Sequence, residues 1–230
     1  MKKKVSANDI FKKYISKGLF GKNSEETIKI FCNLNQKYFY DIAKKYKLKE
    51  RQISALVGFK DEFFVRTLIS QIIEEKGFTD NLYCQKVTAN EKAGLSARAV
   101  KFNGQDKVLT IGGDCVIFRK SDNKPLMIVE CKEYIDMIRM KELIGESQVI
   151  KGKISKSVSL LDDVQFCVFS EVLELTDAWA DFLKNSDLKH KIDQIFVIRA
   201  GKRKDKANKP VEQNLREFKN YIEHFIVNFK

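Results

Sequence analysis

The sequence has few prolines and no long apolar run, and each shortage excludes a class of protein. Its 230 residues include 2 Pro and no low-complexity tract, as expected of a globular chain rather than a disordered one. The longest apolar runs, such as Leu126–Val129, have about four residues, whereas a membrane-spanning helix needs roughly 20. The N-terminal segment is charged and lacks the apolar stretch of a signal peptide. We therefore expect a soluble, cytoplasmic protein with no membrane partner.

Cysteine and histidine are also too sparse to form a recognisable metal motif. The cysteines are odd in number, scattered and without the paired spacing of zinc ligands: Cys32, Cys84, Cys115, Cys131 and Cys167. Three of them lie in apolar runs, which favours buried thiols in a reducing compartment over disulfides or structural zinc. The two histidines, His190 and His224, are isolated, and we assign neither a chemical role.

Positive charge, in contrast, is abundant. The net charge is +12, which favours a polyanionic partner, either nucleic acid or an anionic membrane. A lysine-rich composition without functional meaning is the alternative interpretation. No strongly amphipathic basic helix is evident, so nucleic acid is favoured. Because the aromatic residues are mostly spaced as core residues, a stacking platform for single strands is not indicated.

The first third of the chain has helical periodicity. Residues 5–76 are predicted to be helical, with Ser24 as an N-cap and Gly77 ending an amphipathic helix over Lys60–Lys76. The helices predicted over Tyr38–Tyr46 and Arg51–Phe59 have the spacing of a helix-turn-helix pair. Two packed helices without a role in DNA reading are the alternative.

From about residue 97 the periodicity becomes that of strands. The predicted strands are Arg98–Phe102, Lys107–Ile111, Asp114–Phe118, Leu126–Lys132, Val164–Phe169 and Ile192–Ile198. Helices are predicted from Met137 to about Ile154, near Ala178–Lys184, and from about Val211 to Phe229. This order indicates an α/β or α+β fold with a central mixed β-sheet flanked by helices.

Three charged residues border two of these apolar strands. Asp114 opens one strand, and Glu130 and Lys132 close the next. Side chains at positions i and i+2 share a strand face, so Glu130 and Lys132 should project together, while Cys131 faces the opposite layer. Burying such groups is costly, and two converging carboxylates suit Mg²⁺.

In this interpretation Asp114 and Glu130 hold the metal, with the backbone carbonyl of Cys131 as a further ligand. Lys132 orients or helps to deprotonate an attacking water, or stabilises charge on a phosphate. The same spacing of acids and lysine occurs by chance elsewhere in this charged chain, but only here do all three groups lie on adjacent predicted strands. A strand-end ion pair is the alternative interpretation.

The stretch over Lys60–Ile198 resembles the PD-(D/E)XK nuclease superfamily, which includes type II restriction endonucleases and Holliday-junction resolvases. Its two acids and lysine match Asp114, Glu130 and Lys132, while Gly113 stands where the family pattern has proline. The resemblance suggests Glu62, on the helix before the sheet, as a further catalytic acid. Three residues of the helix after Lys132 are further candidates, of which the last two could line the site: Glu142, Glu146 and Gln148.

The resemblance implies a Mg²⁺-dependent type II restriction endonuclease that cleaves double-stranded DNA in a prokaryotic cell. It implies a nuclease core over residues 60–230, an N-terminal helical region over residues 1–59, a possible homodimer, and a cognate DNA methyltransferase as genetic partner. One alternative is a structure-specific repair nuclease such as a junction resolvase. Another is a non-enzymatic DNA-binding protein that uses the helix-turn-helix pair.

Two basic segments are candidates for holding DNA. The first is the loop over residues 201–210, with Lys202, Arg203, Lys204, Lys206, Asn208 and Lys209. Of these, Arg203 and Asn208 carry side chains suited to reading base edges. The second segment surrounds Gly152 and contains Lys151, Lys153 and Lys156. A solvated loop is the alternative for the first segment.

Overall fold

The computed structural model describes residues 6–15, 18, 20–90, 92–154, 157–185 and 191–229. The expectations placed on Lys156 and His190 lie outside these residues. No helix in the described ranges is long and apolar enough to cross a membrane.

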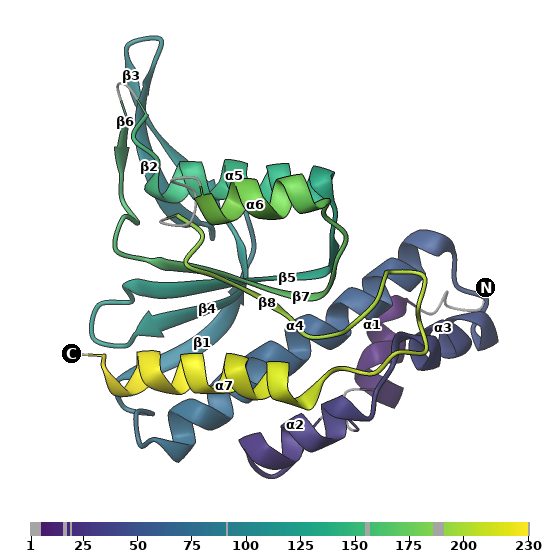
Figure 1. The fold of residues 1–230 in the computed structure, drawn as a ribbon. Helices are drawn as coiled ribbons and strands as arrows, with labels where there is room; N and C mark the ends of the chain where they lie inside the picture. The colour runs from purple at the N-terminus through teal and green to yellow at the C-terminus, as the bar shows by residue number, and fades with distance from the viewer. Residues whose placement is uncertain are drawn as a thin grey trace, which may run out of the picture.

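A five-stranded mixed sheet forms the centre of the fold (Figure 1). Its order is β1 (Leu82–Val87), β4 (Gly113–Arg119), β5 (Pro125–Ile135), β7 (Gln165–Leu173) and β8 (Gln194–Val197). β1, β4 and β5 are antiparallel, whereas β5, β7 and β8 are parallel. The predicted mixed sheet is confirmed, and β5 is its middle strand, as its continuous apolar run indicates.

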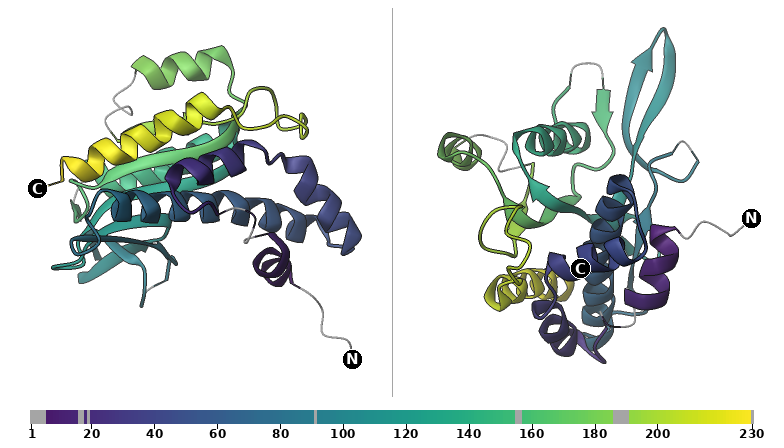
Figure 2. Two further views of the ribbon diagram at one scale, coloured as in Figure 1. Left: turned by 90° about the horizontal axis from the view of Figure 1, so that it is seen from below. Right: turned by 90° about the vertical axis from the view of Figure 1, so that its right-hand side faces the viewer.

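Helices cover both faces of this sheet (Figures 1 and 2). One face carries α1 (Ala7–Ile10), the π-helix η1 (Phe11–Ile15), α2 (Ser24–Cys32), α3 (Gln36–Lys45), α4 (Glu50–Glu75) and α7 (Glu212–Val227). The other carries α5 (Met137–Lys151) and α6 (Asp177–Asn185). Each helical layer encloses its own apolar core against the sheet, so the sheet is apolar on both sides.

Two expectations about helices in the N-terminal region are wrong: the division of α4 and the N-cap of α2. The predicted helices Arg51–Phe59 and Lys60–Lys76 are one helix of 26 residues, which continues through Gly58 without a turn. The expected boundary at residues 59 and 60 therefore falls inside α4. Ser24 is the first residue of α2 rather than its N-cap, since the Asn23 side chain accepts the capping bond from the Glu26 N–H. Gly77 does follow α4 with a positive φ, as predicted.

A second, three-stranded sheet projects from the body of the protein (Figure 1). It has the order β3 (Gln105–Ile111), β2 (Leu95–Phe102) and β6 (Ser157–Ser159). The predicted hairpin is confirmed, and Asn103 and Gly104 both have the positive φ of its tight turn. Buried Arg98 anchors the hairpin, because its guanidinium donates to the carbonyls of Gln148, Val149 and Gly152 at the end of α5. The hairpin and α5 are thereby fixed together.

The sequence analysis missed two strands, β1 and β6. β6 has only three residues, too few for a recognisable alternation. β1 has the burial pattern buried, two intermediate, two exposed, buried, which does not alternate with period two because its register shifts between Gln85 and Val87. This omission matters because β1 carries a residue of the candidate site.

A buried ion network joins α4 to β7 and to Arg199, which follows β8. The Lys60 ammonium lies 2.9 Å from Asp61 and also contacts Glu171 of β7, and the Arg199 guanidinium lies 3.2 Å from Glu171; all four side chains are 1% exposed. The Gln36 amide donates a further hydrogen bond to Glu171. Burial lowers the pKa of Lys60 and raises that of Asp61 to about 6. Glu171 is therefore the common partner of two buried cations.

We predict that Glu171→Ala destabilises the fold strongly. The substitution leaves Lys60 and Arg199 buried without their shared carboxylate, and the loss of one partner of a buried ion pair costs about 3–5 kcal/mol. Denaturant unfolding of both proteins at neutral pH measures the change. Asp163→Asn, which removes a carboxylate that is 86% exposed beside Lys124, is the matched control and should change little. Similar midpoints for Glu171→Ala and wild type would contradict the prediction.

Candidate active site

The antiparallel pairing of β4 and β5 brings two carboxylates together. Cys115 lies opposite Val129, so Asp114 and Glu130, one residue further along each strand, lie at the point where the pairing ends. Both line a cavity of about 400 Å³. The Cys131 N–H donates to Asp114 Oδ2 over 3.0 Å, which fixes this carboxylate against β5.

The two sides of β5 separate the charged groups from the thiol as predicted. Lys132 Nζ lies 3.4 Å from Glu130 Oε2, so these two side chains project together. The Cys131 side chain packs against the other apolar core, which contains α4 and α7. The position of the Cys131 peptide beside Asp114 is compatible with its carbonyl as a ligand, a role that stays a prediction.

The cavity holds Glu130 in an environment that disfavours its charge. Burial, and next the neighbouring Asp114 carboxylate, raise the pKa of Glu130 to about 7, although Lys132 acts in the opposite direction. Burial also raises the pKa of Glu146, a residue of α5 that lines the same cavity. Glu146 Oε2 is buried without a hydrogen-bond partner. The cavity therefore contains more carboxylate than its own cations offset.

Lys132 keeps its positive charge in this setting. Burial alone would lower the pKa of Lys132, but the carboxylates of Glu130, Glu146 and Asp114 outweigh burial and raise it. A protonated ammonium donates hydrogen bonds and accepts no proton. The environment thus favours the expected orienting and charge-stabilising roles of Lys132 over deprotonation of a water.

The structure also brings Glu62 to the site. This residue of α4 lies 3.5 Å from the Arg66 guanidinium, one helical turn away, and 2.5 Å from the Lys86 ammonium. Lys86 Nζ lies 3.2 Å from Asp114 Oδ1 as well, and Arg66 donates to the Asp114 carbonyl over 3.1 Å. Glu62 is 15% exposed and lies inside α4, so it is not a solvated acid at the start of a helix.

Lys86 and Arg66 belong to this site but were not predicted from the sequence. Lys86 lies on β1, the unpredicted edge strand, and burial alone would lower its pKa, but Glu62 and Asp114 raise it. The available signal was the apolar segment Leu82–Cys84 followed by Val87, between two polar turns. A strand predicted there would have included Lys86, but its contact with Asp114 depends on the pairing of β1 with β4.

Gly113 lies beside Asp114, where the structure leaves no space for a side chain. A Cβ atom at Gly113 would lie 2.6 Å from a methyl carbon of Val116 and 3.1 Å from one of Ile128, and 3.9 Å from Glu130 Oε1. The space at residue 113 is therefore too small for a side chain. Glycine here keeps the backbone of β4 close to the Glu130 carboxylate.

The other candidates on α5 divide into near and distant positions. Glu146 lines the cavity as expected, but Gln148 Oε1 instead accepts a hydrogen bond from Lys191 over 3.3 Å. Glu142 is exposed, and its charge contributes to the raised pKa of Glu146. Glu146 is thus the one member of this group that the fold presents to the cavity.

The basic loop over residues 201–210 is folded against the protein body. Lys206 Nζ lies 3.0 Å from Glu133 and 2.8 Å from Gln36 Oε1, and the Arg203 guanidinium stacks 3.9 Å from the Tyr134 ring centroid. The Asn208 amide donates to the carbonyl of Ala200, and Lys209 donates to Asn33. These contacts hold the loop against the protein, so it is not simply a solvated loop.

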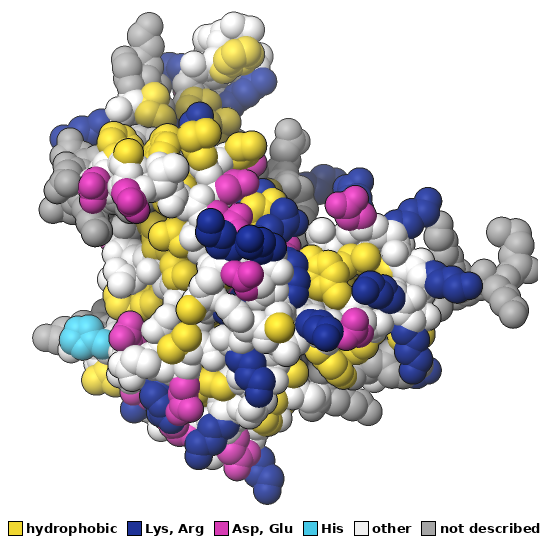
Figure 3. Space-filling view, turned by 45° about the vertical axis from the view of Figure 1, so that its right-hand side comes forward, with side chains coloured by type: hydrophobic (Ala, Val, Ile, Leu, Met, Phe, Trp, Pro, Cys, Tyr) yellow, Lys and Arg dark blue, Asp and Glu magenta, His cyan; other side chains and the backbone are white. Residues whose placement is uncertain are grey.

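The same loop also presents cations at the surface, where they are suited to an anionic partner. Lys202, Arg203, Lys204 and Lys206 line a surface hollow of about 460 Å³ with Tyr40 and Glu174. Figure 3 shows Lys and Arg side chains gathered near the middle of this face, with Asp and Glu among them. DNA contact by these residues stays a prediction.

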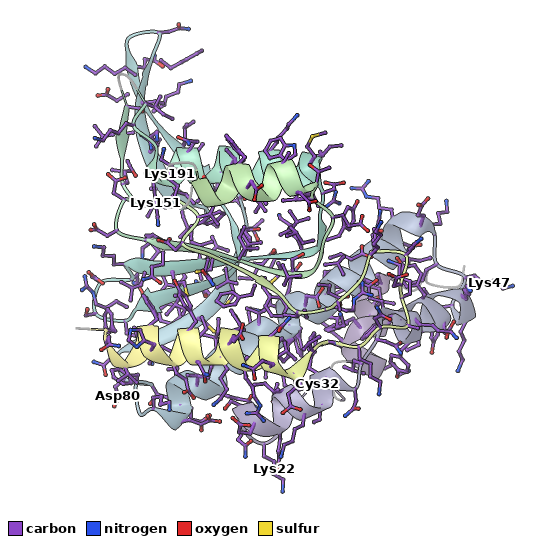
Figure 4. The ribbon with its side chains drawn as sticks, in the orientation of Figure 1. Lys22, Cys32, Lys47, Asp80, Lys151 and Lys191 are labelled. Carbon is purple, nitrogen blue, oxygen red and sulfur yellow. The ribbon has the colours of Figure 1, made fainter. Side chains whose placement is uncertain are left out.

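The second basic segment is also tied to its surroundings. Lys151 forms an ion pair with Asp193, and Figure 4 shows Lys151 and Lys191 in the same part of the protein, below the projecting hairpin. Lys153 is exposed and lines a separate hollow with Lys151 and Arg98. Neither lysine lines the cavity that contains Glu130.

We predict that Glu130→Gln stabilises the metal-free protein at alkaline pH. A carboxyl whose pKa is raised from 4.5 to about 7 favours the folded state below pH 4.5 and loses that contribution as pH rises through 7. The amide carries no such cost, so the variant should be more stable by on the order of 1–3 kcal/mol at pH 8 and little changed near pH 4.5. Thermal or denaturant unfolding in a chelator measures this. A wild type that is the more stable protein at pH 8 would contradict it.

The comparisons with known proteins identify no family for this chain. No family model matches, and no curated protein matches. A search of solved structures finds the native BbvCI A2B2 tetramer at low resolution, with a TM-score of 0.35, 10% identity, and coverage of 100% of this chain and 99% of that chain. A likeness at this TM-score does not establish a shared fold.

Proposed function

We propose that the protein is a Mg²⁺-dependent endonuclease that hydrolyses phosphodiester bonds of double-stranded DNA. One observation carries the proposal: Asp114 and Glu130 converge in a cavity of about 400 Å³, with the Lys132 ammonium 3.4 Å from Glu130. Two carboxylates at the end of the β4–β5 pairing can hold a metal ion, and a neighbouring lysine can orient a water or stabilise charge on a phosphate.

The donor set fits Mg²⁺ better than a transition metal. In the described part of the chain, no group of three or more His, Cys, Asp or Glu side chains is placed to hold a metal ion together, so an ion on Asp114 and Glu130 would take its other ligands from backbone, water or substrate. Mg²⁺ commonly takes one or two carboxylates, and water and substrate phosphate complete its octahedral shell. Asp114 and Glu130 would hold the ion, with the Cys131 carbonyl as a further ligand. Glu62, which shares the Lys86 ammonium with Asp114, would add negative charge next to the Asp114 carboxylate. When bound, Mg²⁺ supplies Lewis-acid polarisation of the phosphate and a more acidic water.

The chain's own groups then have separate tasks. Lys132 donates hydrogen bonds to the attacking water or to the phosphate oxygens, where negative charge increases in the transition state. The Cys131 N–H holds the Asp114 carboxylate in place. Glu146, across the cavity, adds negative potential that attracts the cation.

The positive net charge favours DNA as the substrate. The net charge of +12 attracts a polyanion, and the basic loop over residues 201–210 is available to position a duplex by its phosphates. We propose a type II restriction enzyme as the specific activity, active as a homodimer and paired genetically with a DNA methyltransferase.

We predict that Asp114→Ala and Lys132→Ala each reduce Mg²⁺-dependent plasmid cleavage by at least about a hundredfold, because each removes a group that acts at the reacting phosphate. Gel assays with Mg²⁺ or a chelator measure the rate, and circular dichroism checks folding. Asp163→Asn and Lys124→Ala serve as matched controls, because each removes one partner of an exposed ion pair outside the cavity. Wild-type cleavage by both site variants would refute the assignment.

The type of DNA recognised is tested separately. Discrete fragments from long phage DNA, with constant end sequences, would support a restriction enzyme. Selective cleavage of branched junctions over linear duplex would instead support a structure-specific repair nuclease.

We predict that the affinity for Mg²⁺ falls as the pH drops below about 7. The metal binds the ionised form of Glu130, and the pKa of about 7 means that a proton competes for this carboxylate below neutrality. The limiting slope is about tenfold in affinity per pH unit. Titration calorimetry between pH 6 and 8, in buffers of different ionisation enthalpy, measures both the affinity and the released proton. A pH-independent affinity with no proton release would contradict this prediction.

A further inference from the structure

Lys86 occupies a position between two acids of the candidate site. Its ammonium lies 2.5 Å from Glu62 Oε2 and 3.2 Å from Asp114 Oδ1. The acids are mostly buried, at 15% and 18% side-chain exposure, whereas Lys86 is 43% exposed. A flexible, partly solvated side chain thus neutralises two constrained carboxylates.

Two cavities meet at this lysine. On one side is the cavity of about 400 Å³ that contains Asp114 and Glu130. On the other, a cavity of about 530 Å³ lies between α4 and β1, and Lys86 lines both. The second cavity presents one further cation, one acid, polar groups and two aromatic rings: Arg66, Glu74, Thr67, Ser70, Gln71, Gln85, Cys84, Phe20 and Phe63.

A divalent cation bound to Asp114 competes with the Lys86 ammonium for the charge of this carboxylate. Two positive charges repel each other, and the ion with the greater charge gains more from the carboxylate. Arg66 is held in place by Glu62 and by the Asp114 carbonyl. Lys86 is held only through carboxylates, and its exposed four-carbon stem can rotate. Lys86 is therefore the cation that a bound metal displaces more readily.

We propose that a divalent metal displaces Lys86 from Asp114, and that the freed ammonium binds a backbone phosphate of the DNA strand where the two cavities meet. This inference rests on the proposed function. Lys86 is then an internal counter-ion in the metal-free protein and a phosphate ligand in the metal-bound protein. Arg66, which lines the second cavity with Lys86, supplies a fixed positive charge for the same DNA strand. Metal binding and DNA binding are coupled, because each favours the same displaced position of Lys86.

The test compares wild type with Lys86→Met, which keeps the length of the stem and removes the charge. Calorimetry with Ca²⁺, and fluorescence titration of a short mixed-sequence duplex with and without Ca²⁺, give the affinities and their coupling. We expect Lys86→Met to bind Ca²⁺ about three- to tenfold more tightly, since a competing ion pair is lost. We also expect Ca²⁺ to tighten duplex binding of the wild type by about tenfold and of the variant by clearly less.

The matched control is Lys124→Met, because Lys124 is 44% exposed and pairs with one exposed acid. It should change neither the Ca²⁺ affinity nor the coupling. Unchanged Ca²⁺ affinity in Lys86→Met would overturn the displacement. Tighter Ca²⁺ binding with wild-type coupling would overturn the phosphate contact, because Lys86 would then act only through its charge.

Failure of the proposed function gives a different result. In that case wild type and Lys86→Met both bind no Ca²⁺, or Asp114→Asn binds it as tightly as wild type does. Both outcomes overturn the inference too, but they do so by removing the metal site itself. Loss of the Lys86 effect alone, with an Asp114-dependent Ca²⁺ site, leaves the proposed function intact.

Discussion

The carboxylates of Asp114 and Glu130 are forced together by the pairing of β4 with β5, and neighbouring cations offset their repulsion. Glu130 responds with a pKa of about 7, while Lys132 and Lys86 both keep their charge. An arrangement of this kind costs stability in the metal-free protein. Its retention is readily explained if a cation is bound there, which is why charge crowding, rather than cavity shape, supports the proposed function.

Helices on both faces of the sheet hold the end of the β4–β5 pairing, and with it Asp114 and Glu130, in place. On one side, α4 packs against the sheet through an apolar core and the Lys60–Glu171 ion pair, which places Glu62 beside β1. On the other, Arg98 fixes the end of α5 to the projecting hairpin, which keeps Glu146 facing the cavity. The site therefore depends on side chains from both helical layers, although its central acids come from two adjacent strands.

The sequence predicts the central part of the site well because local rules suffice there. Side chains alternate between the two faces of a strand, so Glu130 and Lys132 share one face. A short turn makes β4 and β5 neighbours, which places Asp114 close to Glu130. The roles of these residues stay predictions. The continuous helix over Glu50–Glu75 was not predicted, since no local signal distinguishes a long helix from two helices in sequence.

Lys86 and the buried ion network could not be found in the same way. Lys86 reaches Asp114 only through the pairing of the irregular edge strand β1 with β4, a contact between segments distant in sequence. Lys60, Glu171 and Arg199 likewise come from three separate elements, and charged residues in apolar segments are normally predicted at the surface. Tertiary packing, which pattern analysis does not capture, determines both.

The most direct test is a crystal structure of the protein grown with Mn²⁺ in place of Mg²⁺, at pH 8, with anomalous scattering data collected at the manganese edge. The account predicts an anomalous peak within ligand distance of both Asp114 and Glu130, with Lys86 withdrawn from Asp114. An anomalous map with no peak at these two carboxylates, under conditions in which the protein cleaves DNA, would contradict it.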